Sequence, residues 1–300
     1  MGRVFLEVVL PVALVAIAGG LVGSWRKVAL QPVSALVFYL FSPMLVFHSL
    51  ATTHLSAGAS LRIIGVMVAT YVAMYIVSMV WSLLRHHESS MRAGFALAAT
   101  SPNAGNMGLP VAQLAFGPAG FDVAVMNFVA GAILANSGGI AVASTASGGS
   151  KLEALRAPFR YPSVYAALAG AVVNVFHLQL PPVIDTPVTT LSAAAVPVML
   201  VVLGLQLKQA VGLDRLPDLV ALNVVRLTVA PVVARFAATA LGLEGVPRGT
   251  LVVLSAMPTA VIATIVATEF GAQPTFVTRA VVTTTIVAML SLTVLITLVR

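Results

Sequence analysis

The sequence has no cysteine and very few charged residues. Among its 300 residues, Asp, Glu, Lys and Arg together make up 8%, and none is Cys. The absence of cysteine excludes disulfides, catalytic thiolates and cysteine-bound metals. Soluble domains contain roughly 25% charged residues, so a chain with so few charges could not cover its surface against water. The surface of this protein is therefore expected to face lipid.

Apolar residues take the place of the missing charges. Hydrophobic residues make up 59% of the sequence, and the mean hydropathy is +1.04. A membrane-spanning helix needs about 20 apolar residues, so we predict an all-α integral membrane protein of ten transmembrane helices with no soluble domain. The predicted spans are residues 4–23, 32–51, 61–84, 92–116, 120–144, 160–178, 187–207, 217–241, 248–271 and 275–298.

The basic residues are distributed unevenly between alternate loops. The net charge is +7, from 16 Lys and Arg against nine acids. One set of loops carries Arg26, Lys27, Arg85, Arg92, Lys151, Arg156, Arg160, Lys208 and Arg215, whereas the other side carries Arg3, Arg62, Arg248 and Arg300. The positive-inside rule makes the first set cytoplasmic, which places both termini outside a cell (inner) membrane. This rule explains the positive charge better than a nucleic-acid partner does.

The two halves of the chain resemble each other at an offset of 156 residues. The matching pairs are Arg92 and Arg248, Pro102 and Pro258, Ala104 and Ala260, and Pro118 and Pro274. Because each half contains an odd number of spans, the second copy must be inverted, as in many secondary transporters. We therefore predict a first five-helix repeat over 1–145, a cytoplasmic connecting loop over 146–159 and an inverted second repeat over 160–300. Chance matching within an apolar sequence is the alternative explanation.

The fourth span contains the strongest local signal, the segment SPNAGNMGLP at 101–110. Its prolines, glycines and asparagines are Pro102, Pro110, Gly105, Gly108, Asn103 and Asn106. Prolines and glycines both weaken a helix, and a broken helix in hydrocarbon is tolerated only where it is buried in protein or lines a wet cavity. The two asparagines, three residues apart, fall on one face of any helical part. We interpret the segment as a functional crossover, with a repaired kink as the simpler alternative.

The ninth span contains a matching break at Pro258, with hydroxyl groups nearby on Ser255, Thr259 and Thr264. Two broken helices that cross at the membrane midplane would bring the N-termini of two half-helices to one point. Such N-termini carry partial positive charge and free N–H groups. The pattern therefore favours binding of an anion, most simply a carboxylate.

These motifs resemble those of the auxin efflux carrier family, which includes plant PIN-type carriers and bacterial malate and malonate carriers. The first half carries Pro102-Asn103, Gly108-Leu109-Pro110 and Phe116-Gly117; the second carries Pro181, Pro197, Gly204, Leu207, Arg226-Leu227, Pro231, Met257-Pro258 and Glu269-Phe270-Gly271. The resemblance implies two inverted five-helix repeats that cross at the prolines of helices four and nine. It also implies elevator-like carriage of small organic acids, with Asn103 in the place of the crossover asparagine.

Two departures from the plant members concern the substrate and the source. Thr259 follows Pro258 where plant members tend to carry an amide residue, which argues against auxin itself. The long hydrophilic central loop of many plant members is absent, which suits a bacterial carrier. The predicted substrate-binding residues are Pro102, Asn103, Gly105, Asn106, Arg226, Ser255, Pro258 and Thr259, and the predicted hinge residues are Pro102, Gly108, Pro110 and Pro258.

Ionisable residues within predicted spans are further candidates. An arginine near the middle of a span normally faces protein or water, so Arg226 is expected to pair with a substrate carboxylate or with a fixed acid such as Glu7. His48 could carry a coupling proton because histidine titrates near neutral pH, and Glu7 and Glu269 are the other candidates for proton coupling.

The function predicted from the sequence is secondary active transport of a small organic anion, such as malonate, malate or an auxin-like acid. The expected partners are this substrate and the lipid bilayer, with a homodimer left open and no nucleic acid. No cofactor or metal is expected. The sequence leaves open whether transport is coupled to H⁺ or Na⁺ or is export assisted by the membrane potential. The alternatives are a sodium-coupled bile-acid-like symporter of the same architecture, a channel and, from another class, a membrane-embedded enzyme. Enzyme motifs are poor, since no phosphate-binding glycine loop or metal-ligand spacing occurs.

Overall fold

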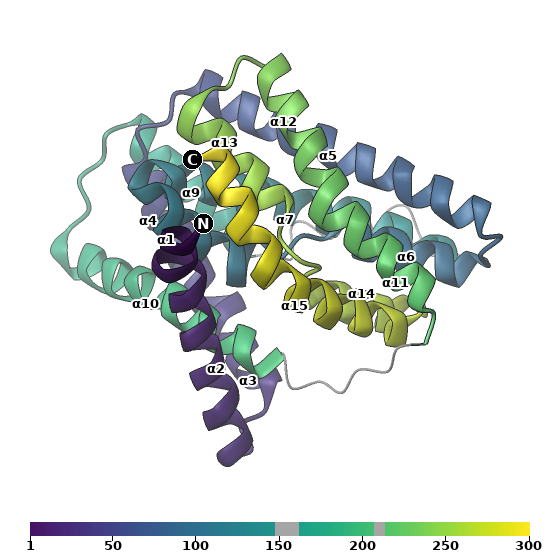
Figure 1. The fold of residues 1–300 in the computed structure, drawn as a ribbon. Helices are drawn as coiled ribbons and strands as arrows, with labels where there is room; N and C mark the ends of the chain where they lie inside the picture. The colour runs from purple at the N-terminus through teal and green to yellow at the C-terminus, as the bar shows by residue number, and fades with distance from the viewer. Residues whose placement is uncertain (148–161, 207–213) are drawn as a thin grey trace.

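A computed structural model describes residues 1–147, 162–206 and 214–300, and regular structure in these ranges is helical (Figure 1). Most of the predicted connecting loop at 146–159, with Lys151 and Arg156, lies outside the described residues. Seven described segments are long and apolar enough to cross a membrane: Gly2–Trp25, Leu30–Thr52, Ala57–Leu84, Ala104–Gly131, Pro182–Gln206, Leu216–Ala240 and Pro274–Val299. The chain is therefore a multi-pass membrane protein.

The helices follow the predicted order closely. The first half contains α1 (Gly2–Val4), η1 (Phe5–Val9), α2 (Leu10–Trp25), α3 (Leu30–Leu36), η2 (Val37–Phe41), α4 (Ser42–Thr52), α5 (Ala57–Leu84), α6 (Ser89–Thr100), η3 (Ala104–Gly108) and α7 (Leu109–Ser147). The second half contains α9 (Pro162–Val175), α10 (Pro182–Gln206), α11 (Leu216–Val224), η5 (Val225–Val229), α12 (Ala230–Ala240), α13 (Gly245–Ser255), α14 (Ile262–Phe270) and α15 (Pro274–Val299). The count of ten spans stays a prediction, because α6, α9, α13 and α14 are each too short to cross a bilayer alone.

Within the described residues, four short π-helical turns interrupt the helices, and each ends two residues before a proline. The turns η1, η2, η3 and η5 precede Pro11, Pro43, Pro110 and Pro231, respectively. A proline ring clashes with the carbonyl four residues earlier and removes one backbone donor. That carbonyl lies within the π-turn in every case, where the wider i→i−5 turn makes room for the ring. The helical conformation thus continues through each of these prolines.

Two helices are broken completely, as the sequence predicts. The first break separates α6 from η3 and α7, and the second separates α13 from α14. The long α7 also turns sharply at Gly117, where φ is 66° and ψ is −159°. A residue with a side chain rarely adopts this left-handed conformation, so Gly117 divides α7 where the sequence predicts a connection between spans four and five.

Helix packing follows an exchanged pattern between the two halves. The first-half segment α2 packs against α10, and α4 packs against α9. If α2 is equivalent to α9 and α4 is equivalent to α10, the α2–α10 contact is equivalent to the α9–α4 contact, as an inverted repeat requires. At Gly204, an added Cβ would overlap the main chain of α2 at Ala16, so this glycine permits the close approach of α2 and α10.

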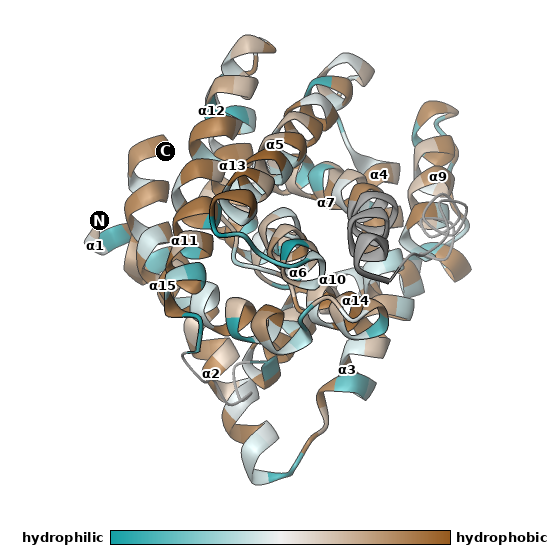
Figure 2. Cartoon of the chain, turned by 90° about the vertical axis from the view of Figure 1, so that its right-hand side faces the viewer, coloured by the Kyte–Doolittle hydropathy of each residue, from teal (hydrophilic) through white to brown (hydrophobic). Residues whose placement is uncertain are grey.

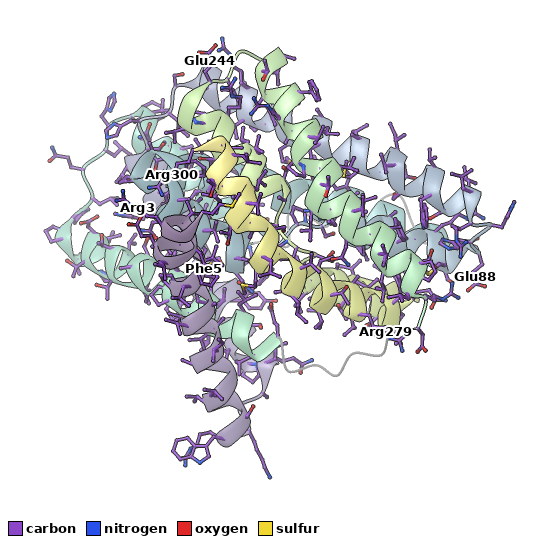
Figure 3. The ribbon with its side chains drawn as sticks, viewed as in Figure 1. Arg3, Phe5, Glu88, Glu244, Arg279 and Arg300 are labelled. Carbon is purple, nitrogen blue, oxygen red and sulfur yellow. The ribbon has the colours of Figure 1, made fainter. Side chains whose placement is uncertain are left out.

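The outer faces of the helices are apolar, and most polar groups lie at helix ends or inside. Large side chains on these faces include Leu21, Leu84, Leu290 and Leu298, each at least 65% exposed. Hydrophobic residues, coloured brown in Figure 2, make up much of the helices, and the labelled charged residues Glu88, Glu244 and Arg279 lie at the periphery in Figure 3. The chain ends lie close together, since α1 contacts α15. This distribution suits a body surrounded by lipid.

Candidate functional site

The two helix breaks meet and exchange backbone hydrogen bonds. The Asn103 N–H donates to the Pro258 carbonyl at 2.7 Å, and the Ala260 N–H donates to the Ser101 carbonyl at 2.8 Å. Pro102 and Thr259 thereby form an isolated antiparallel bridge. Unpaired backbone groups are very unfavourable within a membrane, so each break supplies the partners that the other has lost. The crossing is therefore a defined structural unit.

Thr259 stabilises this crossing through two hydrogen bonds. Its N–H donates to Thr284 Oγ1 on α15 at 3.0 Å, and its hydroxyl donates to the Ala98 carbonyl at the end of α6, also at 3.0 Å. The Thr284 hydroxyl in turn donates to the Ala280 carbonyl at 2.6 Å. Both threonines are completely buried. The structure thus places Thr259 in the framework of the crossing, and Thr284 is a support that the sequence analysis did not identify.

Arg226 connects the ends of both broken helices. Its guanidinium donates to the Ala99 carbonyl at 2.9 Å, to the Ser255 carbonyl at 3.0 Å and to the Met257 carbonyl at 2.7 Å. The predicted pairing with Glu7 is not what the structure shows, because Glu7 accepts a hydrogen bond from Arg3 at the exposed start of the chain. The π-turn η5 carries Arg226, and its side chain is only 2% exposed.

A cavity of about 1090 Å³ opens beside the crossing. Its walls come from α3 and η2, the middle of α5, the segment from Leu97 to Asn106, the end of α10 and both parts of the ninth helix. The starts of η3 and α14 reach the cavity through Ala104, Gly105, Val261 and Ile262. The first N–H groups of a helix lack intrahelical acceptors and carry partial positive charge. The cavity therefore has two helix N-termini at one wall, an arrangement that favours a negatively charged group.

The predicted site residues divide into those that line the cavity and those that stand behind it. Pro102, Asn103, Gly105, Asn106, Arg226, Ser255 and Thr264 line it. Gly108, Pro110, Pro258 and Thr259 are buried and do not line it. Among the three predicted coupling residues, Glu269 lines the cavity, whereas His48 lies in α4 outside the lining and Glu7 is at the surface.

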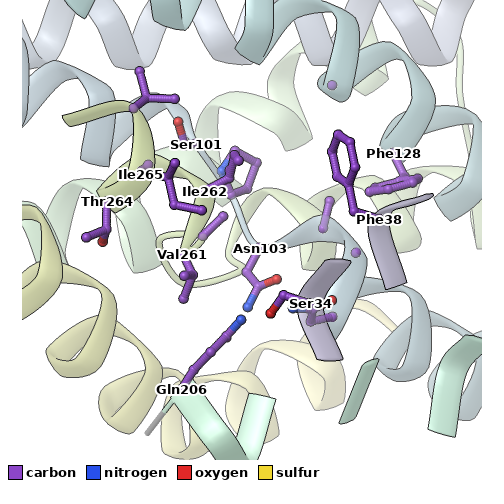
Figure 4. Close-up of a pocket in the computed structure, with 18 of the residues that line it drawn as sticks. Ser34, Phe38, Ser101, Asn103, Phe128, Gln206, Val261, Ile262, Thr264 and Ile265 are labelled. Atoms are coloured by element: carbon purple, nitrogen blue, oxygen red, sulfur yellow. The ribbon is translucent and has the colours of Figure 1, made fainter. Parts of the chain in front are cut away.

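The sequence analysis did not predict several polar residues of the cavity, among them Ser34, Asn127 and Gln206. Ser34 lies in α3, Asn127 lies in α7 and Gln206 ends α10. Figure 4 shows the Asn103 side chain directed toward Ser34 and Gln206. Gln206 is 4% exposed, and its Oε1 has no hydrogen-bond partner among the described residues. The available signal was an amide side chain within an apolar span, but nothing local to the sequence shows which way such a side chain points.

A second polar cluster lies at the far end of α5, away from the cavity. His87 Nε2 lies 3.2 Å from Asp218 Oδ1, and the Trp81 indole N–H donates to the same oxygen at 3.1 Å. Burial lowers the pKa of His87 below its ordinary value, against the opposing effect of Asp218. No group of three His, Asp or Glu side chains within the described ranges could hold a metal ion. Through Asp218, the cluster joins α5 and the α5–α6 loop to α11.

The sequence of this chain is similar to a known protein family and to a protein from an archaeon. The sequence profile of a family described as membrane transport protein matches residues 4–154 and 149–296, which together cover almost the entire chain. The two matched stretches divide close to the predicted boundary between the repeats. An uncharacterized transporter from Methanothermobacter thermautotrophicus is 27% identical over 251 residues, which cover 83% of this chain and 82% of that relative.

Proposed function

Because this chain belongs to the membrane transport protein family, we propose that it is a secondary active transporter that carries a small organic anion across the cell membrane. Membership identifies a multi-pass transporter, and the substrate and mechanism are our proposal. The observation that carries it is the cavity at the crossing, where the starts of η3 and α14 face the same space as the Asn103 side chain.

The charge distribution around the crossing supports an anionic substrate. The cavity wall offers two helix N-termini together with the side-chain amides of Asn103, Asn106 and Gln206. These groups are well suited to accept a carboxylate, because backbone and amide N–H groups donate to its oxygens. Mono- and dicarboxylates such as malonate or malate both belong to the proposed class, with the carboxylate bound at the midplane crossing.

The packing supports alternating access by movement of one helix group against another. One group contains α2, α3, α4, α9 and α10, in which α10 contacts α2, α3 and α4, and α4 contacts α9. The other contains α5, α6, α7 and α12–α15, which hold the crossing. The cavity is lined from both groups, with Ser34 and Gln206 on one wall and Asn103 on the other. Movement of the crossing past the first group would carry a bound anion from one side of the membrane to the other, as in an elevator.

The membrane potential determines which direction needs coupling. Each elementary charge that crosses is worth about 2.3 kcal/mol per 100 mV. With the cell interior negative, export of a monoanion is favourable, whereas accumulation of a dianion requires cations to move with it. Glu269 is our proposed proton carrier for that case, since it is the predicted coupling residue that lines the cavity.

The test is uptake of labelled acids into proteoliposomes. Labelled malonate, malate and indole acetate would be supplied with and without a pH gradient, with protein-free liposomes as the blank. We expect saturable uptake of at least one acid, its loss in Asn103→Ala and its retention in Asn174→Ala. Asn174 is a matched asparagine outside the cavity, whose amide donates to the carbonyls of Ala51 and Thr53. If none of the acids shows saturable movement, the proposal is wrong.

A further inference from the structure

We infer that the guanidinium of Arg226 is a built-in cation that occupies the position where a coupling sodium ion would otherwise bind, and that the crossing therefore does not bind sodium. The inference rests on the proposed transport function, because a coupling ion has meaning only in a carrier. Arg226 is then a positioning residue that acts through the two broken helices, and the anion binds in the cavity at the N-termini of η3 and α14.

The first observation is the convergence of three carbonyl oxygens on one side chain. The Arg226 guanidinium donates to the carbonyls of Ala99, Ser255 and Met257 at 2.9, 3.0 and 2.7 Å. Ala99 lies in the last turn of α6, and Ser255 and Met257 lie at the end of α13 and just beyond it. In transporters with broken helices, freed carbonyls and half-helix C-termini of this kind coordinate Na⁺. Here the same type of oxygen set is occupied by a protein side chain.

The second observation is a charge balance. Each helix C-terminus carries roughly −0.5 elementary charge, so the ends of α6 and α13 together present about one negative charge. The guanidinium supplies one positive charge and is always protonated. Because Arg226 is only 2% exposed, water screens its charge poorly, and a second cation beside it would be repelled strongly.

The third observation is that none of the ion pairs among the described residues involves Arg226. Glu7 pairs with Arg3, Asp214 with Arg279, and Asp218 with His87. The three hydrogen bonds that the Arg226 guanidinium donates all go to backbone carbonyls. An arginine held by carbonyls of two broken helices keeps their C-termini together, while their N-terminal partners, η3 and α14, face the cavity.

The C-termini and the N-termini of the broken helices therefore have different roles. Arg226 neutralises the two C-termini permanently, and the two N-termini stay available for the anion. A sodium gradient has no oxygen set at this point to act on, so any cation coupling must use a different group. The lack of a sodium site at the crossing distinguishes this protein from a sodium-coupled symporter of the same architecture.

The experiment measures thermal unfolding of the full-length protein in detergent, with NaCl and choline chloride compared at equal ionic strength. We expect the melting temperature of the wild type to be the same in both salts. In Arg226→Ala, which exposes the three carbonyls, we expect a lower melting temperature that rises by several degrees in NaCl or in millimolar methylguanidinium. Arg226→Lys keeps the charge, so it should stay closer to wild type and show no response to sodium. Arg235→Ala, on the exposed face of the same segment, is the matched control and should behave as wild type.

A sodium-specific rise in the wild type would overturn the inference, as would an Arg226→Ala protein that responds to neither cation. If Arg226→Ala cannot be purified, Arg226→Lys decides: a sodium response in that variant contradicts the inference, and its absence with a near-wild-type melting temperature supports it. The measurement contains no organic acid. It can therefore fail while saturable uptake of an acid still holds, and the reverse is equally distinguishable.

Discussion

Replacing Thr284 by valine tests whether the crossing is held from behind by α15. Valine has nearly the same shape as threonine, so the packing of this completely buried position should change little. The variant loses the oxygen that accepts the Thr259 N–H at 3.0 Å. The perturbation therefore removes one hydrogen bond at the centre of the two broken helices.

The expected magnitude follows from the environment of the Thr259 N–H. A buried donor left without a partner costs about 1–3 kcal/mol. Each kcal/mol shifts the melting temperature of a domain of roughly this size by about 2–4 °C. The Thr284 hydroxyl also donates to the Ala280 carbonyl, so a control is needed that loses only this kind of bond.

Thr285→Val is that control. Thr285 is 2% exposed, and its hydroxyl donates to the carbonyl four residues earlier, Val281, at 2.6 Å. We expect Thr284→Val to melt roughly 2–12 °C below Thr285→Val in detergent, the range that follows from those two estimates. Uptake by Thr284→Val in proteoliposomes should also be slower. Equal melting temperatures and equal uptake for the two variants would show that the α15 contact does not support the crossing.

Four further predictions concern the cavity, the second break, the polar cluster and helix packing. Asn103→Ala should lower uptake by about 10–100-fold, since a hydrogen bond to a charged group is worth about 1.5–3 kcal/mol, while the amount of protein in the membrane is unchanged; normal uptake would remove Asn103 from the site. Pro258→Ala should slow transport by letting the ninth helix continue through its break, measured as initial uptake rate, and unchanged kinetics would contradict this. The lowered pKa of His87 favours its neutral form in the folded protein, so stability should be greatest above the ordinary pKa of about 6.5 and fall as the pH drops through it; His87→Gln should reduce this fall in melting temperature, and exposed His86→Gln should not. Gly204→Ala should destabilise the protein by about 1–3 kcal/mol, because the new methyl group overpacks the contact with α2; a melting temperature equal to wild type would contradict the close approach.

Predictions that depend on local backbone chemistry could be made from the sequence. Pro102 stands in a cluster with Gly105, Gly108 and Pro110, and such a cluster weakens a helix far more than a single proline does. The break at Pro258 was predicted from its match to Pro102 at the 156-residue offset. The seventh predicted span began at 187, but α10 begins at Pro182. Proline is favoured in the first turn of a helix, but Pro182 takes that place in α10 and Pro187 lies inside the helix.

Interactions with residues far away in the sequence could not be predicted from the sequence alone. The position of Arg226 within an apolar span indicated a buried charge, but the span does not reveal whether its partner is an acid or a carbonyl. Its actual partners, at Ala99, Ser255 and Met257, come from two other helices. The side-chain direction of Gln206 toward Asn103 likewise depends on how α10 packs.

The sequence by itself determined that the chain lies in a membrane, that two of its helices are broken and that both breaks carry polar residues, because composition and proline chemistry act without reference to the rest of the fold. The tertiary structure alone decided that the breaks pair with each other, that Thr284 supports them and that Arg226 closes their C-terminal ends. Hydrogen bonds between groups far apart in the sequence form only when packing brings donor and acceptor within about 3 Å, and no local pattern encodes that distance.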